Sequence, residues 1–259
     1  MRNKAVTFEE KKAIQLEMLK EIDAFCRIKN IKYSLAFGTL LGAIRHKGFI
    51  PWDDDVDIMM PLPDMLRFRD LFHSETMQYC DIDTDSHFRY AFARIANTRT
   101  FNKAGLIYKS YGVCIDLYTI VSIPDSKEEQ QSFFHKAAQM ERISDFWGKW
   151  RSRAIRHLPI KTIPFYRQAV RRITEHLRYS FQYGETKSFY IIAGPICLYP
   201  KMSYDTDLFN NTVDVDFEGN KFKAISNYDL YLTLRYGDYM TPPPESQRHP
   251  YHGGSYFWK

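Results

Sequence analysis

Four aspartates, the residues with the clearest capacity for chemistry, fall in one short run of the chain: Asp53, Asp54, Asp55 and Asp57. The end of this run alternates acidic and aliphatic residues, a pattern typical of a strand in which Asp55 and Asp57 share one face. Two such carboxylates repel each other unless a proton or a cation lies between them. Mg²⁺ held by one or two carboxylates usually acts together with substrate phosphates. The run therefore predicts a phosphoryl-transfer site in which Asp55 and Asp57 are metal ligands.

A site of this kind usually needs a third acid from a neighbouring strand, which binds metal or accepts the proton of the nucleophile. Asp116 is the candidate, because it lies in an apolar strand where a buried charge must be paired or bind metal. The alternative is an ion pair with Arg94, which is itself a candidate phosphate contact. Asp53 and Asp54 are either further acids of the substrate site or parts of a solvated turn.

The residues before the acidic run predict contacts with a phosphorylated substrate. Gly38 and Thr39, between a predicted strand and a short helix, would form a small anion cradle, with a simple helix cap as the alternative. Arg45 and Lys47 would neutralise a diphosphate, unless they are only solvent-exposed. Trp52 would stack on a base or on a quaternary ammonium group, with core packing as its alternative.

The elements that position these residues follow from periodicity and turn signals. A capping box at Thr7 and Glu10 begins a helix over residues 8–29, and Glu218-Gly219-Asn220 predicts a hairpin over 212–225. Strands are predicted at 33–37, in a segment ending at Met60, at 89–95 and at 113–120. Helices are predicted at 39–45, 64–72 and 227–236, and the region 126–180 is predicted to be mostly helical, with breaks near Pro159 and Pro164. Strands mixed with helices in this order predict an α/β or α+β core.

Composition narrows the class of protein. The 259 residues are 44% hydrophobic and 16% aromatic, enough for one large core or two small ones. The longest apolar stretch, residues 190–199, is far shorter than the ~20 residues of a spanning helix, and the N-terminus lacks the apolar segment of a signal peptide. The four scattered cysteines lack zinc spacing and are expected to be reduced and buried. These features predict a cytoplasmic protein.

The net charge of +5 is concentrated in one segment, residues 149–178, which carries nine basic residues and a single acid, Glu175. A basic helical segment with interspersed aromatic residues can lie on an anionic membrane, here the inner face of the cell membrane. The alternative is an ordinary solvated helix face. No nucleic-acid partner is expected, because no nucleic-acid-binding motif accompanies the charge.

The run GTLLGAIRHKGFIPWDDDVDIMMP, from Gly38 to Pro61, resembles the signature of the LicD family. The resemblance continues at residues 112–117 (GVCIDL), 217–219 (FEG), 228–232 (YDLYL), 236–240 (YGDYM) and 242–243 (PP), so it extends from about residue 30 to about residue 245. It implies an α+β fold, with a nucleotidyltransferase-like mixed β-sheet core, surrounding helices and helical additions. The chain departs from the family after Asp116, where Leu-Tyr-Thr-Ile-Val replaces the frequent Phe-Pro-Leu-Asp.

By the family's pattern, Asp55 and Asp57 are the ligands of Mg²⁺ or Mn²⁺, and Asp116 is the third acid. The resemblance also implies a single catalytic domain over residues 1–259. Its parts would be a core sheet at about 30–122, a basic helical insertion at about 126–180, and a C-terminal hairpin and helix at about 203–245.

The best-known members of the LicD family are bacterial phosphocholine transferases, so the resemblance implies transfer of a phospho-alcohol with release of CMP. The expected partners are CDP-choline or another CDP-alcohol as donor and a glycan or glycolipid as acceptor, such as lipopolysaccharide, teichoic acid or capsule. The related fukutin group transfers ribitol phosphate, so the alcohol stays open among choline, glycerol, ribitol and ethanolamine.

Two other functions are alternatives: a nucleotidyltransferase that releases pyrophosphate, and a non-catalytic module that binds a membrane surface. Near the C-terminus, His249, His252 and Tyr256 either line the acceptor site or belong to a tail.

Overall fold

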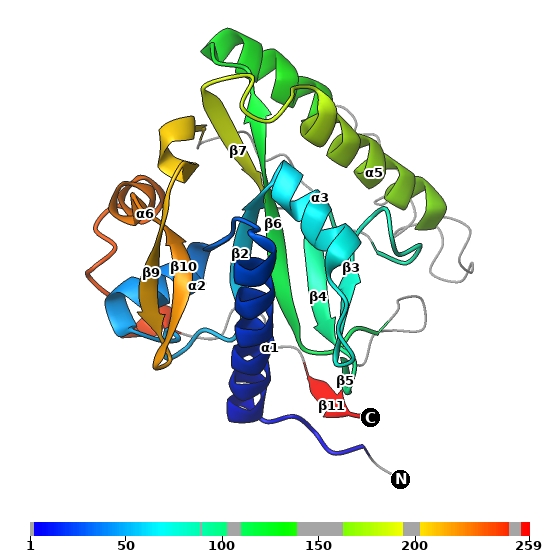
Figure 1. Cartoon of the computed structure of the whole chain (residues 1–259), viewed down its shortest axis with the longest axis vertical. Coiled ribbons are helices and arrows are strands. Elements are labelled where there is room, and N and C mark those ends of the chain that lie inside the picture. The colour runs from blue at the N-terminus through cyan, green and yellow to red at the C-terminus, as the bar shows by residue number, and fades with distance from the viewer. Residues whose placement is uncertain (1–2, 89, 103–109, 139–162, 194–202, 249–254) are drawn as a thin grey trace.

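A mixed seven-stranded sheet lies at the centre of the molecule, with helices packed against it and a hairpin beside it (Figure 1). The computed structural model describes residues 3–88, 90–102, 110–138, 163–193, 203–248 and 255–259. The α+β class and the mixed sheet that the sequence predicts are confirmed.

The main path of this sheet runs in the order β1-β2-β6-β4-β3, and β6 is its central strand. The strands are β1 (Ser34–Leu35), β2 (Asp57–Pro61), β3 (Met77–Cys80), β4 (Ala93–Asn97), β6 (Cys114–Ile123), β7 (Ser188–Ile192) and β8 (Tyr204–Asp205). Strand β6 pairs with β2 in parallel along one edge. Along its other edge, it pairs antiparallel first with β4 and then with β7, which continues to β8. The parallel pair brings the start of β2 beside the start of β6.

The helices cover this sheet and its ends. Helix α1 (Phe8–Lys29) crosses in front of β2 and β6 in Figure 1 and contacts β6. Helices α2 (Phe37–His46) and α3 (Leu62–Leu71) follow β1 and β2 along the chain. The remaining helical segments are residues 127–138, α5 (Ile163–Tyr179), α6 (Tyr228–Tyr236) and two short 3₁₀ turns, Thr206–Phe209 and Glu245–Gln247.

Local sequence signals place two of these elements correctly. Both hydrogen bonds of the predicted capping box are present, between the Glu10 N–H and the Thr7 hydroxyl and between the Thr7 N–H and the Glu10 carboxylate. The predicted hairpin is β9 (Thr212–Phe217) with β10 (Asn220–Ile225), and its turn residues Glu218 and Gly219 both have positive φ. Its strand β10 is fastened to β1, because the Ile225 N–H donates to the Ser34 hydroxyl at 2.9 Å.

Several predicted boundaries are wrong. The acidic strand begins only at Asp57, so Asp55 lies before the strand and is not placed by its alternation. Helix α3 begins at Leu62, because Pro63 suits a first helical turn. Helix α5 is described from Ile163, beside the predicted break near Pro164. The predicted break near Pro159 lies outside the described residues.

Five strands were not predicted: β3, β7, β8 and the pair formed by β5 (Thr100–Asn102) with β11 (Tyr256–Trp258). Each has at most five residues, too few to show a clear period.

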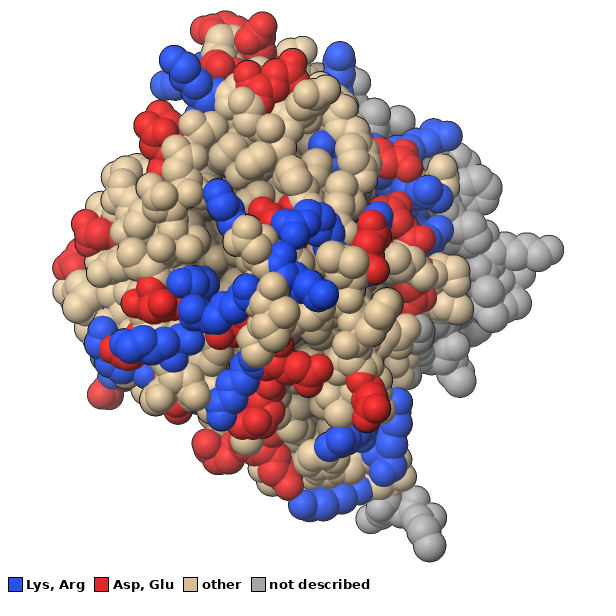
Figure 2. Space-filling model, viewed as in Figure 1, with Lys and Arg blue, Asp and Glu red and all other residues tan. Residues whose placement is uncertain are grey.

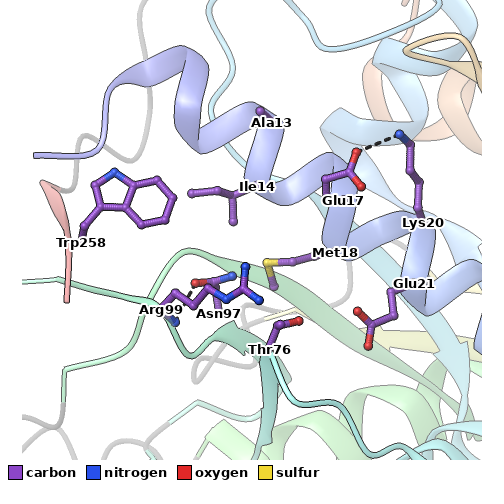
Figure 3. A pocket seen from close by; sticks show the side chains of 10 residues that line it. All are labelled: Ala13, Ile14, Glu17, Met18, Lys20, Glu21, Thr76, Asn97, Arg99 and Trp258. Carbon is purple, nitrogen blue, oxygen red and sulfur yellow. Dashed lines mark hydrogen bonds and ion pairs between the residues drawn. The ribbon is translucent and has the colours of Figure 1, made fainter.

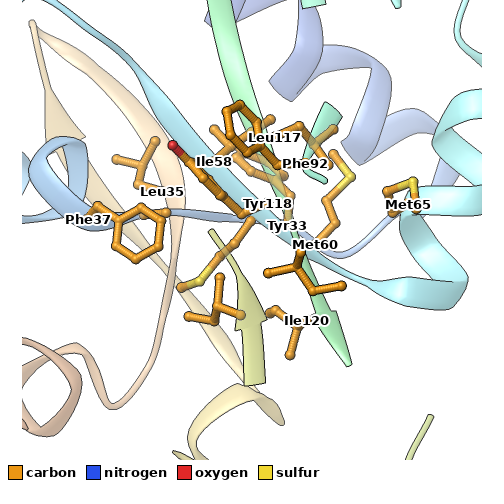
Figure 4. Close-up of a cluster of buried hydrophobic side chains, with 14 of the residues drawn as sticks. Tyr33, Leu35, Phe37, Ile58, Met60, Met65, Phe92, Leu117, Tyr118 and Ile120 are labelled. Atoms are coloured by element: carbon orange, nitrogen blue, oxygen red, sulfur yellow. The ribbon is translucent and has the colours of Figure 1, made fainter. Parts of the chain in front are cut away.

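Buried apolar side chains hold strands β1, β2 and β6 together. Leu35 of β1, Ile58 of β2 and Leu117 of β6 are fully buried in one cluster, to which Phe92 and Tyr118 contribute aromatic rings (Figure 4). Burial of each aliphatic side chain stabilises the fold by about 1.5–3 kcal/mol, so a shift in strand register would lose several of these contributions. The register of β2 against β6 is therefore set by the core.

The structure shows the environment of three of the four cysteines. Cys26 and Cys80 are buried thiols and Cys114 is half-buried, while Cys197 lies outside the described residues. Among the residues described, no helix has both the length and the apolar character to cross a membrane.

Gly112, just before β6, allows the β4–β5 turn to approach the backbone. A Cβ atom there would lie 2.0 Å from the Asn97 carbonyl oxygen. We expect Gly112→Ala to lower the free energy of unfolding by about 3 kcal/mol or more, since backbone must move. Gly184→Ala is the control, because its site is open and only its φ of 85° is unfavourable; about 1 kcal/mol is expected. Urea denaturation measures both, and equal losses would contradict the prediction.

Candidate functional site

Three charged residues form one row across the centre of the sheet. Asp57 of β2 is the register partner of Asp116 of β6, and Asp116 is in turn the register partner of Arg94 of β4. Laterally paired residues point to the same face of a sheet, so the fold brings these side chains together from three distant segments. Two carboxylates and one guanidinium thus lie side by side.

Asp116 is engaged by Arg94 through two hydrogen bonds. Arg94 donates from Nε to Oδ1 at 2.7 Å and from Nη2 to Oδ2 at 3.2 Å, and its guanidinium lies 4.3 Å from the centre of the Tyr90 ring. This is the ion pair that the sequence leaves open as the alternative for Asp116. The pair orients Asp116 beside Asp57, and the role of Asp116 as a metal ligand stays a prediction.

Asp57 is buried without compensation for one of its oxygens. It is only 6% exposed, and its Oδ1 atom has no hydrogen-bond partner in the described structure. Burial, reinforced by the charges of Asp55, Asp116 and Asp53, raises the pKa of Asp57 well above its usual value. A buried, unpartnered carboxylate oxygen surrounded by like charges is a suitable place for a cation.

Asp53 and Asp55 interact closely at the entrance to β2. Burial first, and then the charge of Asp55, raises the pKa of Asp53 to about 7. The Asp53 carboxylate also lies over the first turn of α2, where a Cβ on Gly38 would come within 2.6 Å of its Oδ2. The absence of a side chain at Gly38 therefore lets Asp53 occupy this position.

Asp54 has different surroundings from the other aspartates of the run. Its Oδ2 accepts a hydrogen bond from Lys11 Nζ at 2.7 Å, and both side chains are buried. Lys11 belongs to α1, far from the acidic run in sequence, and no sequence signal pointed to it. Asp54 thus lies in an internal ion pair, neither in a solvated turn nor facing open solvent.

In the predicted anion cradle of Gly38 and Thr39, the threonine hydroxyl already takes part in a hydrogen bond within the protein. The buried Thr39 hydroxyl accepts a hydrogen bond from the Asp57 N–H at 2.8 Å, so in this structure it supports the backbone of the acidic strand. Gly38 lies in the first turn of α2, beside Asp53. Their roles in binding phosphate stay predictions.

The two predicted diphosphate contacts, Arg45 and Lys47, differ in their surroundings. Arg45 donates to the Tyr239 carbonyl at 2.7 Å and to His46 at 2.9 Å, and burial, followed by the charge of Arg248, lowers its pKa. Lys47 is exposed at the end of α2. Trp52 is half-buried, and the guanidinium of Arg248 lies 5.3 Å from its ring centre, so a cation already lies near that ring.

Sequence reasoning missed an aromatic wall beside the carboxylates. The Tyr118 ring packs against Phe37 at 4.7 Å and Phe92 at 5.0 Å, and Arg235 lies 4.1 Å from the centre of the Phe37 ring. Tyr118 is two residues after Asp116 in the same strand, so strand alternation could have placed it on the same face. Arg235 comes from α6 and carried no such signal.

Tyr256 also belongs to this region. Lys11 Nζ lies 5.4 Å from the centre of its ring, and burial, then the charges of Cys114 and Asp116, raises its pKa. The sequence left Tyr256 open between a site residue and a tail. The structure places it in β11, close to Lys11, whereas His249 and His252 lie outside the described residues.

The residues present fit a divalent cation in chemical type. In the described ranges, no group of three or more His, Cys, Asp or Glu side chains is arranged to hold a metal ion. The fit depends on Asp57, whose Oδ1 has no hydrogen-bond partner among the described residues and is the hard oxygen donor that Mg²⁺ prefers, and on the nearby charges of Asp55 and Asp116. Binding of Mg²⁺ or Mn²⁺ to Asp55, Asp57 and Asp116 remains a proposal.

The described half of the basic segment is engaged within the protein. Arg178 is 1% exposed and pairs with Asp83 at 3.2 Å, Arg171 pairs with Glu175 at 2.9 Å, and Arg167 donates to the Ile82 carbonyl. Residues 149–162 lie outside the described part. On the face that carries α1, Lys and Arg are interspersed with Asp and Glu (Figure 2). These contacts favour the ordinary helix face for the part of α5 that is described.

A pocket of about 560 Å³ lies under α1, apart from the residues discussed so far (Figure 3). Its lining includes Ile14 and Met18 of α1, Asn97 at the end of β4, Arg99, and Trp258 of β11, whose ring faces Ile14 in Figure 3. None of the predicted site residues lines it. We assign it no part in the reaction.

Comparison with known proteins agrees with this geometry. The family described as LicD/FKTN/FKRP, nucleotidyltransferase domain, matches residues 30–170, which is more than half of the chain and contains the whole charged row. The chain belongs to this family.

Individual relatives give further similarity. The chain is 28% identical to the lipopolysaccharide cholinephosphotransferase LicD of Haemophilus influenzae, over 96% of this chain and 97% of that protein. It is also 42% identical to an uncharacterized protein of Rickettsia typhi over 26% of this chain, and 51% identical to one of Rickettsia prowazekii over 18%. The chain spans only 22% and 18% of the lengths of those two proteins.

The crowding of carboxylates predicts a pH-dependent stability. Because the folded pKa of Asp53, about 7, exceeds the ordinary value of 3.8, the folded protein binds more protons in this interval, and stability falls as pH rises from about 4 to 7. In EDTA at pH 8, we expect Asp55→Asn to raise the free energy of unfolding by about 1 kcal/mol, and to raise it less at pH 5. Thermal melts at both pH values measure this.

Asp216→Asn is the control for this prediction, because Asp216 is exposed on the hairpin and pairs with Lys221 at 2.7 Å. It should give no gain in stability at either pH. A loss of stability in Asp55→Asn at pH 8 would show that mutual repulsion does not dominate at the acidic run.

Proposed function

We propose that this protein transfers phosphocholine, or a similar phospho-alcohol, from a CDP-linked donor to a hydroxyl group of a cell-surface glycan. The observation that carries the proposal is the buried carboxylate of Asp57, which lies next to Asp116 in the parallel pair β2–β6 and whose Oδ1 has no hydrogen-bond partner among the described residues. Membership of the family and the printed activity of the Haemophilus influenzae relative support the same chemistry. Lipopolysaccharide is the acceptor that this relative favours, with teichoic acid and capsule as the alternatives.

The reaction is an in-line displacement at the distal phosphorus of the donor. The acceptor hydroxyl oxygen forms a bond to this phosphorus, the bond from phosphorus to the CMP oxygen breaks, and CMP leaves. Asp116, held in orientation by Arg94, would accept the proton of the acceptor hydroxyl. Mg²⁺ or Mn²⁺, held by Asp55 and Asp57 with Asp116 as a further ligand, would supply positive charge for the diphosphate and the departing CMP.

Cationic and aromatic side chains around the carboxylates would hold the donor. Arg45 would contact phosphate oxygens, and Gly38 leaves the space that Asp53 needs. The guanidinium plane of Arg235 beside Phe37 offers a surface on which a base could stack, and the half-buried Trp52 ring could hold a base or an alkylammonium group in place of Arg248. These contacts do not distinguish choline from ethanolamine, glycerol or ribitol.

The products separate this proposal from nucleotidyl transfer, which the family description also supports. Purified protein would be incubated with CDP-choline, with and without Mg²⁺, and with lipopolysaccharide, teichoic acid or capsule as acceptor. Metal-dependent release of CMP that requires an acceptor is the expected result. Release from CDP-glycerol or CDP-ribitol alone would change the alcohol, and release of pyrophosphate from a nucleoside triphosphate would establish the nucleotidyl reaction instead.

A substitution at Asp57 tests its role directly. We expect Asp57→Ala to fold but to lose at least ~10³-fold in rate, because charge stabilisation by a metal contributes several kcal/mol to the transition state. CMP release under saturating donor measures the rate, and circular dichroism checks folding. Asp216→Ala, on the exposed hairpin, should keep the wild-type rate. If Asp57→Ala kept more than a tenth of that rate, Asp57 would be excluded from the site.

A further inference from the structure

The four aspartates of the acidic run divide into two groups by their contacts. The charge of Asp55 raises the pKa of both Asp53 and Asp57, and the Asp54 N–H donates to Asp53 Oδ1 at 3.1 Å, whereas the side chain of Asp54 is paired elsewhere. Asp54 is only 4% exposed, and its Oδ2 accepts from Lys11 at 2.7 Å. Its Oδ1 is buried without a hydrogen-bond partner in the described structure. Among the hydrogen bonds described, the Asp54 carboxylate therefore depends on Lys11.

Lys11 lies on α1, a helix that contacts both the acidic run and the start of β6. It lies near the N-terminal end of α1 and is 8% exposed. One turn later, Gln15 of the same helix donates to the Cys114 carbonyl at 3.1 Å, two residues before Asp116. Helix α1 thus holds the acidic run through Lys11 and the start of β6 through Gln15, in agreement with its position across β2 and β6 in Figure 1.

Both ends of the chain hold α1 in this place. The Val6 N–H donates to the Tyr256 carbonyl at 2.8 Å, and the Trp258 N–H donates to the Lys4 carbonyl at 2.9 Å. Strand β11, which carries Tyr256 and Trp258, is paired in turn with β5. Backbone hydrogen bonds therefore hold residues 4–6, which lead directly into α1, against β11.

We propose that Lys11 and Asp54 form a positioning pair, in which Asp54 anchors the acidic run on α1 so that Asp53, Asp55 and Asp57 face the reaction. Asp54 would then be neither a metal ligand nor a substrate contact. The proposal deepens the phospho-alcohol transfer proposed above and depends on it for the catalytic consequence. A buried charge that loses its partner destabilises its surroundings strongly, whereas an apolar pair of similar size is often tolerated.

A double-mutant cycle tests the pair: Lys11→Met, Asp54→Leu and the double variant Lys11→Met/Asp54→Leu, with Lys20→Met as the matched control. Lys20 lies on the same helix, and its pair with Glu17 has side chains 40% and 73% exposed, so its loss should change little. Three quantities are measured: the thermal midpoint Tm in EDTA, amide hydrogen exchange over residues 53–57, and CMP release from CDP-choline with Mg²⁺ and lipopolysaccharide.

Each single variant should lower Tm by about 6 °C or more, accelerate exchange over residues 53–57, and lower kcat at least tenfold with a smaller change in KM. The double variant should recover most of the Tm, the slow exchange and at least a third of kcat. Lys11→Arg, which keeps the charge, should stay closer to wild type than Lys11→Met.

Two outcomes would overturn the proposal. If the double variant regains stability and slow exchange but stays as inactive as Asp54→Leu, then Asp54 takes part in the chemistry. If Lys11→Met exchanges over residues 53–57 as slowly as Lys20→Met, the pair does not position the run. Absence of CMP release by the wild-type protein would instead contradict the proposed function, and Tm and hydrogen exchange would still decide whether the pair anchors the acidic run.

Discussion

The mutual repulsion of buried carboxylates at the start of β2 is the constraint on which the rest of the site depends. Parallel pairing of β2 with β6 puts Asp57 next to Asp116, and Asp53 and Asp55 follow closely. Away from bulk water, this repulsion is large, so the charges cannot stay together without support. The guanidinium of Arg94 compensates the charge of Asp116, and the ammonium group of Lys11 compensates that of Asp54. In the described structure, one carboxylate oxygen of Asp57 has no hydrogen-bond partner.

The distribution of these partners determines which carboxylate is available. Arg94 pairs with Asp116 and Lys11 pairs with Asp54, so two acids of the cluster have a cationic partner. Thr39 holds the backbone of Asp57 through the Asp57 N–H, and among the described residues the Oδ1 atom of Asp57 has no hydrogen-bond partner. Groups with strongly raised pKa values at such places are typical of functional sites, where stability is lost in exchange for reactivity.

The sequence predicts those parts of the fold whose signals are local. The capping box at Thr7 and Glu10 and the Glu218-Gly219 turn are contained in a few residues, and both are confirmed. The conformation before β2 depends on a contact between distant residues, because Asp54 is bound by a lysine 43 positions earlier. The residues before Asp57 therefore do not show the alternation of a strand. The sequence does predict which residues form the charged row of Asp57, Asp116 and Arg94, because it offers either a metal or Arg94 as the partner of Asp116.

Three side chains that lie near the carboxylates or their aromatic neighbours come from outside the part of the chain that the family model matches. Residues 30–170 contain the carboxylates and Arg94, whereas Lys11, Arg235 and Tyr256 reach the same region from α1, α6 and β11. The charged row of Asp57, Asp116 and Arg94 is therefore carried by the matched part of the chain. Side chains from segments before and after that part lie around it, with Lys11 paired to Asp54 and Arg235 on the ring of Phe37. A family match over residues 30–170 thus accounts for the charged row but not for all of the side chains that surround it, because these meet only when α1, α6 and β11 pack onto the sheet.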